Sequence, residues 1–129
     1  MRALVVEDDT MLAKIFGMVI ASFFSGIEYA TNGEDGFMMY CQALEKNDPY
    51  DVIFLDIMMP RVTGLQVLEQ IRHRENEFSC GCITIIMLTA LDDQQTIDTA
   101  FNLGCNYYLK KPVDKHQVKK SLVEVGLMQ

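Results

Sequence analysis

The segment Asp51–Pro60, DVIFLDIMMP, decides the fold, because a run of apolar residues within it ends abruptly in a carboxylate. Residues 52–55 are all apolar, and a short continuous apolar run is typical of a strand buried on both faces of a parallel sheet. Asp56 follows this run directly. The segment therefore predicts a buried strand over 52–55 with an acid at its carboxyl end.

Strand-like and helical patterns alternate along the rest of the chain. Strands are expected at 3–6, 27–30, 52–55, 83–88 and 107–110. Between them, helices are expected to begin after Asp9 or Thr10, after Asn32-Gly33, at Thr63-Gly64, near Asp92 and at Asp114. The first helix carries Leu12, Ile15, Phe16, Val19 and Ile20 at helical spacing and stops around Gly26, while the fourth ends at Leu103 before Gly104. A polar loop, RENEFSCG over 74–81, is expected before the fourth strand.

Five such strand–helix units predict an α/β fold, an open parallel sheet with helices on both faces. Right-handed crossovers favour the flavodoxin-like, doubly wound strand order 2-1-3-4-5. The chain has 129 residues, half of them hydrophobic, which suits one domain over residues 1–129 with a packed core.

Charge and composition exclude several classes of protein. The net charge of -7 argues against nucleic-acid binding, and the late lysines (110, 111, 115, 119 and 120) are interpreted as a solvated helix face plus one special lysine. The apolar stretch Ile15–Ile27 is shorter than the roughly 20 residues of a membrane span. No secretory leader precedes the first strand, so we expect a soluble, cytoplasmic protein with reduced thiols. The four cysteines lack the spacing of a zinc site.

Acidic and polar residues follow the ends of four predicted strands. Because the carboxyl ends of parallel strands share one edge of the sheet, these residues should meet where the strand order reverses. They are Glu7, Asp8 and Asp9 after the first strand, Asp56 after the third, Thr89 after the fourth, and Lys110 and Lys111 after the fifth.

Such a set suits phosphoryl chemistry on a carboxylate. Clustered carboxylates without histidine favour a hard cation such as Mg²⁺, and a lysine and a hydroxyl can contact phosphoryl oxygens. Transfer to a carboxylate nucleophile needs mainly positioning and electrostatic stabilisation. Each residue also has a simpler interpretation: a helix cap for the acids and for Thr89, a turn for Asp56, and a surface side chain for Lys111.

At this point the sequence resembles the receiver domain of two-component response regulators, of the chemotaxis CheY type, over essentially the whole chain. The resemblance lies in LVVEDD (4–9), DVIFLDIMMPRVTG (51–64), IIMLTA (85–90) and YYLKKP (107–112). It implies that Asp56 accepts a phosphoryl group from a sensor histidine kinase or phosphotransfer protein. It also implies that Asp8 binds Mg²⁺ directly, Glu7 through water and Met58 through its backbone carbonyl, which leaves Asp9 as the helix cap.

The same resemblance implies roles for the later motifs. Thr89 would contact the phosphoryl group, and Lys111 rather than Lys110 would pair with it, because the family lysine adjoins the proline. The Lys111-Pro112 bond is often cis in this family. Thr89 and Tyr108 would switch together and change the face made by residues 92–103, 107–110 and 114–125, which a downstream partner or output domain reads.

Two departures from the family concern loops near and far from this edge. The loop between Arg74 and Cys82 looks longer than in the chemotaxis prototype, and it lies at the opposite end of the sheet. Met58 and Leu91 are apolar where they would border the attacking water. The hypothesis is that their bulk slows hydrolysis of the acyl phosphate.

Three other functions compete with a phosphoryl switch. A phosphohydrolase with an aspartyl phosphate would carry a second acid where Met58 stands, and a flavin binder would need a phosphate loop in place of EDDT (7–10). A degenerate receiver is disfavoured by the intact acids, Thr89 and Lys111. The chain is therefore expected to be a switch that catalyses its own phosphorylation and slow dephosphorylation, with no outside substrate. We expect a natural N-terminus and a monomer, either a stand-alone regulator or a receiver within a larger protein.

Overall fold

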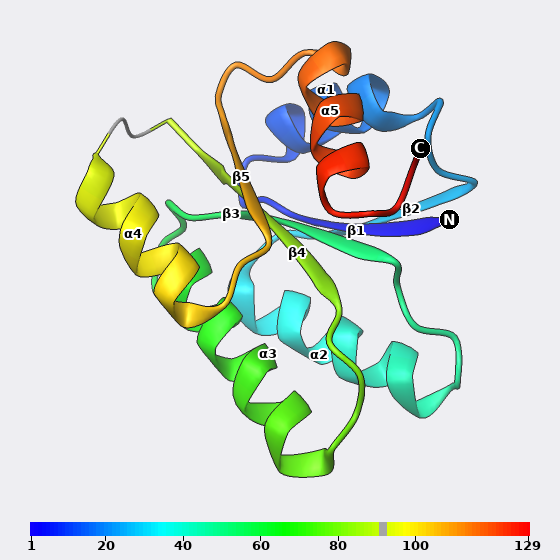
Figure 1. The fold of residues 1–129 in the computed structure, drawn as a ribbon, viewed down its shortest axis with the longest axis vertical. Helices are drawn as coiled ribbons and strands as arrows, with labels where there is room; N and C mark the ends of the chain where they lie inside the picture. The colour runs from blue at the N-terminus through cyan, green and yellow to red at the C-terminus, as the bar shows by residue number, and fades with distance from the viewer. Residues whose placement is uncertain (91–92) are drawn as a thin grey trace.

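The computed structural model describes residues 1–90 and 93–129, and its five strands form one parallel sheet (Figure 1). The order across the sheet is β2-β1-β3-β4-β5, as predicted. The strands are β1 (Arg2–Val6), β2 (Gly26–Ala30), β3 (Val52–Asp56), β4 (Thr84–Thr89) and β5 (Tyr107–Lys110). The α/β doubly wound fold predicted from the sequence is therefore confirmed, with five of the ten predicted strand ends shifted by one residue.

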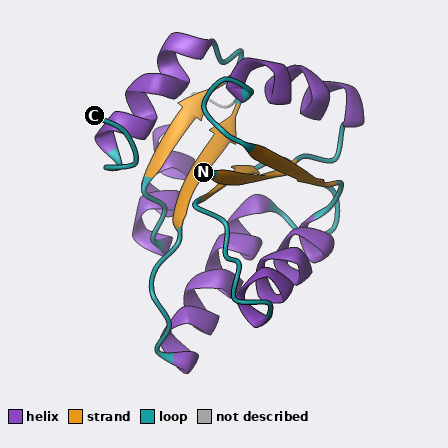
Figure 2. Ribbon diagram, turned by 90° about the vertical axis from the view of Figure 1, so that its right-hand side faces the viewer, coloured by secondary structure: helices purple, strands orange, loops and turns teal. Residues whose placement is uncertain are grey.

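Helices cover both faces of this sheet (Figures 1 and 2). On one face lie α1 (Thr10–Ile20) and α5 (Lys115–Glu124); on the other lie α2 (Gly33–Glu45), α3 (Gly64–Phe78) and α4 (Gln94–Leu103). Each face has its own apolar core. Phe54 anchors the first core, packing edge-on against Phe16 and Phe24, while Ile53, Leu55 and Met87 point into the second.

The burial of the strands follows their positions in the sheet. All five residues of β3 are buried, and β1 and β4 are buried except at their first residue, because each has a strand on both sides and helices above and below. The edge strands β2 and β5 are only partly buried. The continuous apolar runs of the sequence thus identify the three central strands.

Short polar residues begin the helices as expected. Asp9 caps α1 by accepting hydrogen bonds from the backbone N–H groups of Met11 and Leu12 at 3.0 and 3.1 Å. Asn32 caps α2, and Thr63 and Asp114 form reciprocal capping boxes at α3 and α5. Gly104 ends α4 at φ +106°, a conformation that side chains with a Cβ rarely adopt. Asp93 caps α4, while the expected start near Asp92 lies outside the described residues.

The prediction of a polar loop over 74–81 is wrong for residues 74–78, because α3 continues to Phe78. The helix is extended by Glu75, which is buried at 3 % exposure and accepts hydrogen bonds from Arg72 at 2.7 Å and from the backbone N–H of Ile83 at 2.6 Å. A run of charged residues resembles a loop in sequence, but the carboxylate of Glu75 also accepts a hydrogen bond from outside the helix, from the N–H of Ile83. The helix then ends at Ser79 in the left-handed conformation.

The first helix also differs from expectation, since it ends at Ile20 instead of near Gly26. Of its expected apolar positions, Phe16 and Ile20 are buried, but Leu12 and Ile15 are 46 % and 52 % exposed. The helix is apolar around most of its circumference, so periodicity alone could not identify the buried side. No helix among residues 1–90 and 93–129 has both the length and the apolar character required to cross a bilayer.

Candidate functional site

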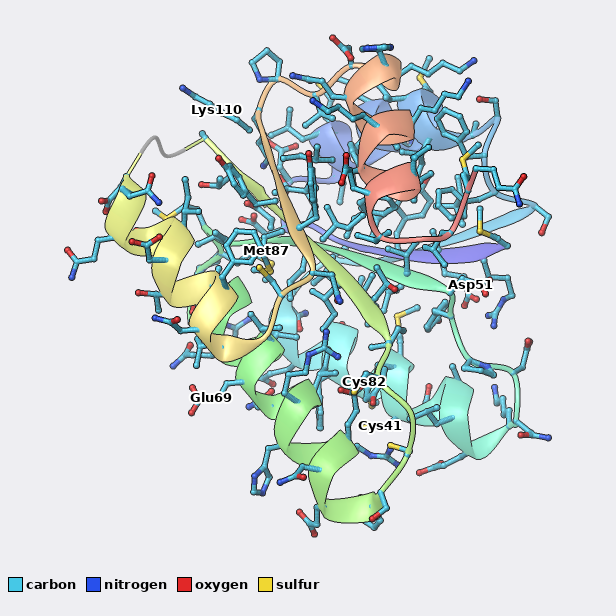
Figure 3. The ribbon with its side chains drawn as sticks, in the orientation of Figure 1. Cys41, Asp51, Glu69, Cys82, Met87 and Lys110 are labelled. Carbon is cyan, nitrogen blue, oxygen red and sulfur yellow. The ribbon has the colours of Figure 1, made fainter. Side chains whose placement is uncertain are left out.

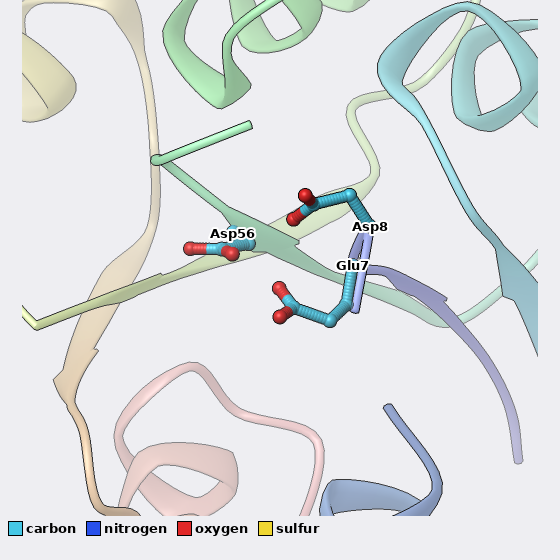
Figure 4. A group of neighbouring side chains, drawn as sticks. All are labelled: Glu7, Asp8 and Asp56. Atoms are coloured by element: carbon cyan, nitrogen blue, oxygen red, sulfur yellow. The ribbon is translucent and has the colours of Figure 1, made fainter. Parts of the chain in front are cut away.

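Three carboxylates meet at the carboxyl ends of β1 and β3. The strand order reverses between these two strands, which is where parallel sheets bind their ligands. Glu7 and Asp8 directly follow β1, and Asp56 is the last residue of β3. One oxygen from each lies within 4.8 Å of the others, and Figure 4 shows the three carboxylates grouped around a common space. The convergence predicted from the strand ends is therefore present.

Lys111 reaches into this group of acids. The Nζ of Lys111 lies 3.2 Å from Oδ2 of Asp56 and 3.5 Å from Oε2 of Glu7. Lys110 is exposed and lies at the periphery of the molecule in Figure 3. Lys110 is the last residue of β5 and Lys111 follows it, and in an extended chain two successive side chains point to opposite sides. The Lys111-Pro112 peptide bond is cis.

Glu7 is buried beside two other acids, and both facts favour its protonated form. Burial raises the pKa of Glu7 to about 8, helped by a hydrogen bond to Asp56 and by the charges of Asp56 and Asp8; Lys111 acts in the opposite direction. Glu7 is 4 % exposed and Asp56 is 3 % exposed, so water screens their repulsion poorly. A divalent cation would remove this repulsion and return Glu7 to its ionised form.

The set of donors fits Mg²⁺ in particular. Its atoms are carboxylate oxygens from Glu7, Asp8 and Asp56, with no histidine or cysteine among them. Hard oxygen ligands in small number leave positions for water and phosphate oxygens, which is how Mg²⁺ usually binds in proteins. Over residues 1–90 and 93–129 this is the one group of acids, histidines or cysteines close enough together to hold a metal ion.

The backbone around Asp56 is held from several sides. The N–H of Met58 donates to Oδ1 of Asp56 at 3.2 Å, which orients the carboxylate. The N–H of Ile57 donates to the carbonyl of Leu88, and that of Gly64 to the carbonyl of Ile57, both at 3.0 Å. A Cβ on Gly64 would lie only 2.1 Å from the backbone oxygen of Asp56, so this position requires glycine.

The sequence indicates Gly64 only as the start of a helix and gives no sign of its close approach to Asp56. Its spacing of eight residues from the acid was visible, but nothing in the sequence shows that the helix start folds back onto the strand end. Met58, assigned to the metal through its carbonyl, has a side chain that is 61 % exposed beside the site. Leu91, paired with it in the hydrolysis hypothesis, lies outside the described residues.

The remaining candidates lie at the ends of β4 and β5. Thr89 is fully buried, and its carbonyl accepts a hydrogen bond from the N–H of Lys111 at 2.7 Å, which joins the two strand ends. Tyr108 is half-buried, with its ring edge-on to Phe101 of α4 at 5.9 Å between centroids. Thr89 therefore lies at the strand end near the acids, and Tyr108 lies at the contact between β5 and α4.

An apolar groove of about 390 Å³ opens beside the acids, between α1 and the segment that joins β5 to α5. Leu12 and Ile15 of α1 form one wall, and Pro112 and Val113 form the other. Glu7 and Lys111 also line the groove, so it is continuous with the acidic site. The exposure of Leu12 and Ile15, which the helical pattern did not predict, belongs to this surface.

Comparisons with known proteins agree with this geometry. Residues 3–123 match the family model described as the response regulator receiver domain. The chain is 33 % identical over 125 residues to a probable C4-dicarboxylate response regulator of Halalkalibacterium halodurans, covering 95 % of this chain and 50 % of the relative. It spans about half, or far less, of the length of the curated relatives it matches.

Two solved structures are similar in fold and in sequence. The receiver domain of Ssk1 of Saccharomyces cerevisiae, solved with the histidine phosphotransfer protein Ypd1, has a TM-score of 0.83 and 28 % identity, with 98 % of this chain and 88 % of that chain covered. A CheX-CheY-BeF3-Mg complex of Borrelia burgdorferi gives a TM-score of 0.83 at 25 % identity, covering 96 % and 87 %. The match over 121 of the 129 residues, together with the grouped acids at the strand ends, shows that this chain belongs to the response regulator receiver domain family.

Proposed function

We propose that residues 1–129 form one cytoplasmic receiver domain. Its Asp56 accepts a phosphoryl group from a sensor histidine kinase or a phosphotransfer protein. One observation carries this proposal. Asp56 is a buried carboxylate grouped with two further acids and paired with Lys111, at the point where the sheet reverses its strand order. That arrangement supplies a nucleophile, a site for a cation and a fixed positive charge within one small volume.

Each side chain then has a task in the transfer. Glu7, Asp8 and Asp56, with the backbone carbonyl of Met58, would hold Mg²⁺, which supplies charge neutralisation for the phosphoryl oxygens. An oxygen of Asp56 attacks phosphorus, the P–N bond of the donor phosphohistidine breaks, and the imidazole leaves with its electron pair. The N–H of Met58 keeps the other Asp56 oxygen in place.

Lys111 and Thr89 stabilise the phosphoryl group once it is bound. Lys111 already lies within 3.2 Å of Asp56, so little reorganisation is needed for it to pair with a phosphoryl oxygen. Thr89 would donate its hydroxyl to a second oxygen. Because Lys111 donates its backbone N–H to the carbonyl of Thr89, a shift of one strand end is transmitted to the other.

The signal would be read on the face made by α4, β5 and α5. Tyr108 contacts Phe101 of α4 in the present arrangement. Movement of Thr89 toward the phosphoryl group would change the space behind Tyr108, and the ring would turn inward with a change in its contact to α4. A downstream protein, or an output domain of the same polypeptide, would bind the two arrangements of this face with different affinities.

The phosphodonor would sit over the groove beside the acids. The groove opens onto Glu7 and Lys111, so a protein that delivers a phosphoryl group to Asp56 must cover it or border it. The yeast relative was solved with a histidine phosphotransfer protein, which supports a partner of this kind. Leu12 and Ile15 would provide apolar contact area, and the local negative charge would favour a basic surface on the donor.

The site does not support a phosphohydrolase acting on outside substrates. Such an enzyme needs a second acid to protonate its leaving group, and Met58 occupies that position with an exposed thioether. The chain would act as a phosphoacceptor switch that promotes its own phosphorylation and a slow loss of the phosphoryl group.

The decisive experiment treats the protein with acetyl phosphate and Mg²⁺ and measures the gain of one phosphoryl group by intact mass. We expect Asp56→Asn to gain none, whereas Asp51→Asn, which changes an acid next to the opposite end of β3 (Figure 3), should react as wild type does. Phosphorylation of Asp56→Asn at the wild-type rate would show that the acceptor is elsewhere.

A further inference from the structure

Met58 is an exposed thioether fixed at the edge of the phosphoacceptor site. Its side chain is 61 % exposed, while the next methionine, Met59, is only 6 % exposed. Its backbone cannot move away from the acid, because its N–H donates to Oδ1 of Asp56 and the loop that carries it is closed by the hydrogen bond from Gly64 to Ile57. An oxidisable sulfur atom is therefore presented to solvent beside the residue that carries the phosphoryl group.

We propose that Met58 is a site of reversible oxidation through which hydroperoxides shorten the lifetime of the phosphoryl group on Asp56. This inference rests on the proposed function, since it requires that Asp56 be phosphorylated. It assigns to the same site a second chemical input, an oxidant, in addition to the phosphodonor.

The oxidation step is a two-electron transfer of one oxygen atom. A lone pair on the Met58 sulfur attacks the terminal oxygen of a hydroperoxide and forms an S–O bond as the O–O bond breaks. The remaining oxygen leaves with the proton, as water from hydrogen peroxide or as an alcohol from an organic hydroperoxide. Sulfur is oxidised to the sulfoxide and the peroxide is reduced. Methionine sulfoxide reductases reverse the change.

The sulfoxide changes what the side chain does to nearby water. A thioether is a weak acceptor, and its apolar bulk beside the acyl phosphate keeps water away or poorly oriented. A sulfoxide oxygen is polar and accepts strong hydrogen bonds. It would hold a water molecule next to the acyl phosphate of Asp56, where hydrolysis needs one. Oxidation should therefore accelerate loss of phosphate by about threefold to tenfold, the rate equivalent of one ordinary hydrogen bond gained in the transition state.

Met11 is 70 % exposed in the first turn of α1 and lies close along the chain to Asp8, and it is retained in Met58→Leu, so that variant separates its oxidation from that of Met58. Other exposed sulfur atoms lie farther from the site. Met38 is 49 % exposed but belongs to α2, and Met18 is 78 % exposed near the end of α1 remote from the acids. Burial raises the pKa of the Cys41 and Cys105 thiols, which keeps them protonated and slow toward peroxide. Cys82 precedes β4, at the end of the sheet opposite Thr89, and in Figure 3 it lies far from Lys110.

The test compares oxidised and unoxidised protein within each variant. Wild type, Met58→Leu and Met38→Leu are treated with hydrogen peroxide, their thiols having first been blocked, and peptide mass mapping then locates the sulfoxides. Each sample is phosphorylated with acetyl phosphate and Mg²⁺, freed of donor, and followed by intact mass until the phosphoryl group is lost. We expect faster loss after oxidation in wild type and Met38→Leu, reversal by methionine sulfoxide reductases, and no response to peroxide in Met58→Leu.

Two results would overturn the proposal. One is an unmodified Met58 in the peptide map under conditions that oxidise Met38; the other is an equal phosphate lifetime before and after oxidation of Met58. Met58→Gln, which places an amide oxygen in a side chain of similar length, should lose phosphate faster than Met58→Leu without any oxidant, and equal lifetimes in these two variants would also contradict it. If neither wild type nor any variant accepts a phosphoryl group, the proposed function itself has failed. A phosphate lifetime that is unchanged by oxidation contradicts only the role of Met58.

Discussion

Both ends of the sheet carry more acids than basic residues, but they differ in how completely their buried acids are paired. At the amino ends of the strands, Arg2 pairs with Glu28 and Asp48, and its backbone N–H donates to Asp51 at 2.7 Å. Nearby, Arg72 and Glu75 pair at 2.7 Å. At the carboxyl ends, Lys111 is shared by Glu7 at 3.5 Å and Asp56 at 3.2 Å, and Asp8 adds a third carboxylate to the group.

Two buried glutamates, one at each end of the sheet, differ in this way. Glu75 is 3 % exposed, and each of its oxygens accepts a short hydrogen bond, one from Arg72 and one from the N–H of Ile83. Glu7 is 4 % exposed, but Lys111 lies 3.5 Å away and is shared with Asp56. Burial therefore does not distinguish a structural acid from a functional one. The completeness of the partners does, and an acid left incompletely paired marks the place where a cation or ligand completes the set.

The largest effect on stability is expected at the amino ends of the strands, where both oxygens of Glu75 are paired. Glu75→Ala removes one member of a buried pair and leaves Arg72 and the N–H of Ile83 without that acceptor, so the free energy of unfolding should fall by about 3–5 kcal/mol. Urea denaturation followed by circular dichroism measures this change. Glu77→Ala, in the same helix but with its side chain 58 % exposed, is the matched control and should change stability little. A loss of similar size in both variants would mean that the buried pair contributes no more to stability than the exposed side chain of Glu77.

The incomplete pairing of Glu7 at the carboxyl ends should make the stability of the protein depend on pH. A carboxyl whose folded pKa is raised to about 8 binds its proton more tightly in the folded state, so its destabilising contribution is absent below about pH 4.5 and complete above about pH 8. Without Mg²⁺, the free energy of unfolding of wild type relative to Glu7→Gln should decrease by on the order of 2–4 kcal/mol across this window. Chemical denaturation at a series of pH values measures the difference.

Magnesium should remove most of that pH dependence, because the ion replaces the proton between the carboxylates. The same titration in saturating Mg²⁺ is the control. A difference between wild type and Glu7→Gln that is flat from pH 5 to pH 8 without Mg²⁺ would contradict the raised pKa and, with it, the contrast between Glu7 and Glu75.

A smaller effect is expected for the binding of the cation itself. Asp8→Asn removes one negative ligand and should weaken Mg²⁺ binding by roughly 10- to 100-fold, measured by isothermal titration calorimetry at pH 8. Asp9→Asn is the control, since Asp9 caps α1 through its Oδ1 and asparagine retains that acceptor. Equal affinities for Mg²⁺ in the two variants would remove Asp8 from the metal site.

The smallest effect concerns the apolar groove beside Glu7 and Lys111 at the carboxyl ends of the strands. Ile15→Asp places a charge on its apolar wall and should slow phosphoryl transfer from a phosphotransfer protein by about tenfold, the cost of one good apolar contact. Met38→Asp, an exposed apolar position on α2, is the control. The rate with acetyl phosphate, which docks no protein, provides the reference. A loss of the same size with both donors would point to damage at Asp56 and not to docking.

Much of the candidate site could be predicted from the sequence because its residues directly follow strands. The apolar run over 52–55 places Asp56 at a strand end, and LVV places Glu7 and Asp8 at another, so a parallel sheet is sufficient to bring them together. Gly64 could not be assigned in this way. Its importance depends on how closely the start of α3 approaches the backbone of Asp56, a distance between segments that no local pattern encodes.

The errors have a common physical cause as well. Leu12 and Ile15 fit the same helical pattern as the buried Phe16, and only the position of α5 and the segment before it decides which of them stays exposed. The charged run beginning at Arg74 looked like a loop, because the partners that keep Glu75 inside a helix come from Ile83 and Arg72.

The sequence by itself determined the order of strands and helices, most of the helix caps and the convergence of acids at one edge, because periodicity, capping and the direction of parallel strands act between near neighbours in the chain. Only the tertiary structure decided the partners of each charge: that Lys111 lies near both Glu7 and Asp56, that Glu75 accepts one hydrogen bond on each oxygen, and that Glu7 shares its lysine. Electrostatic free energies depend on distance and burial, and both are set by packing between residues far apart in the chain.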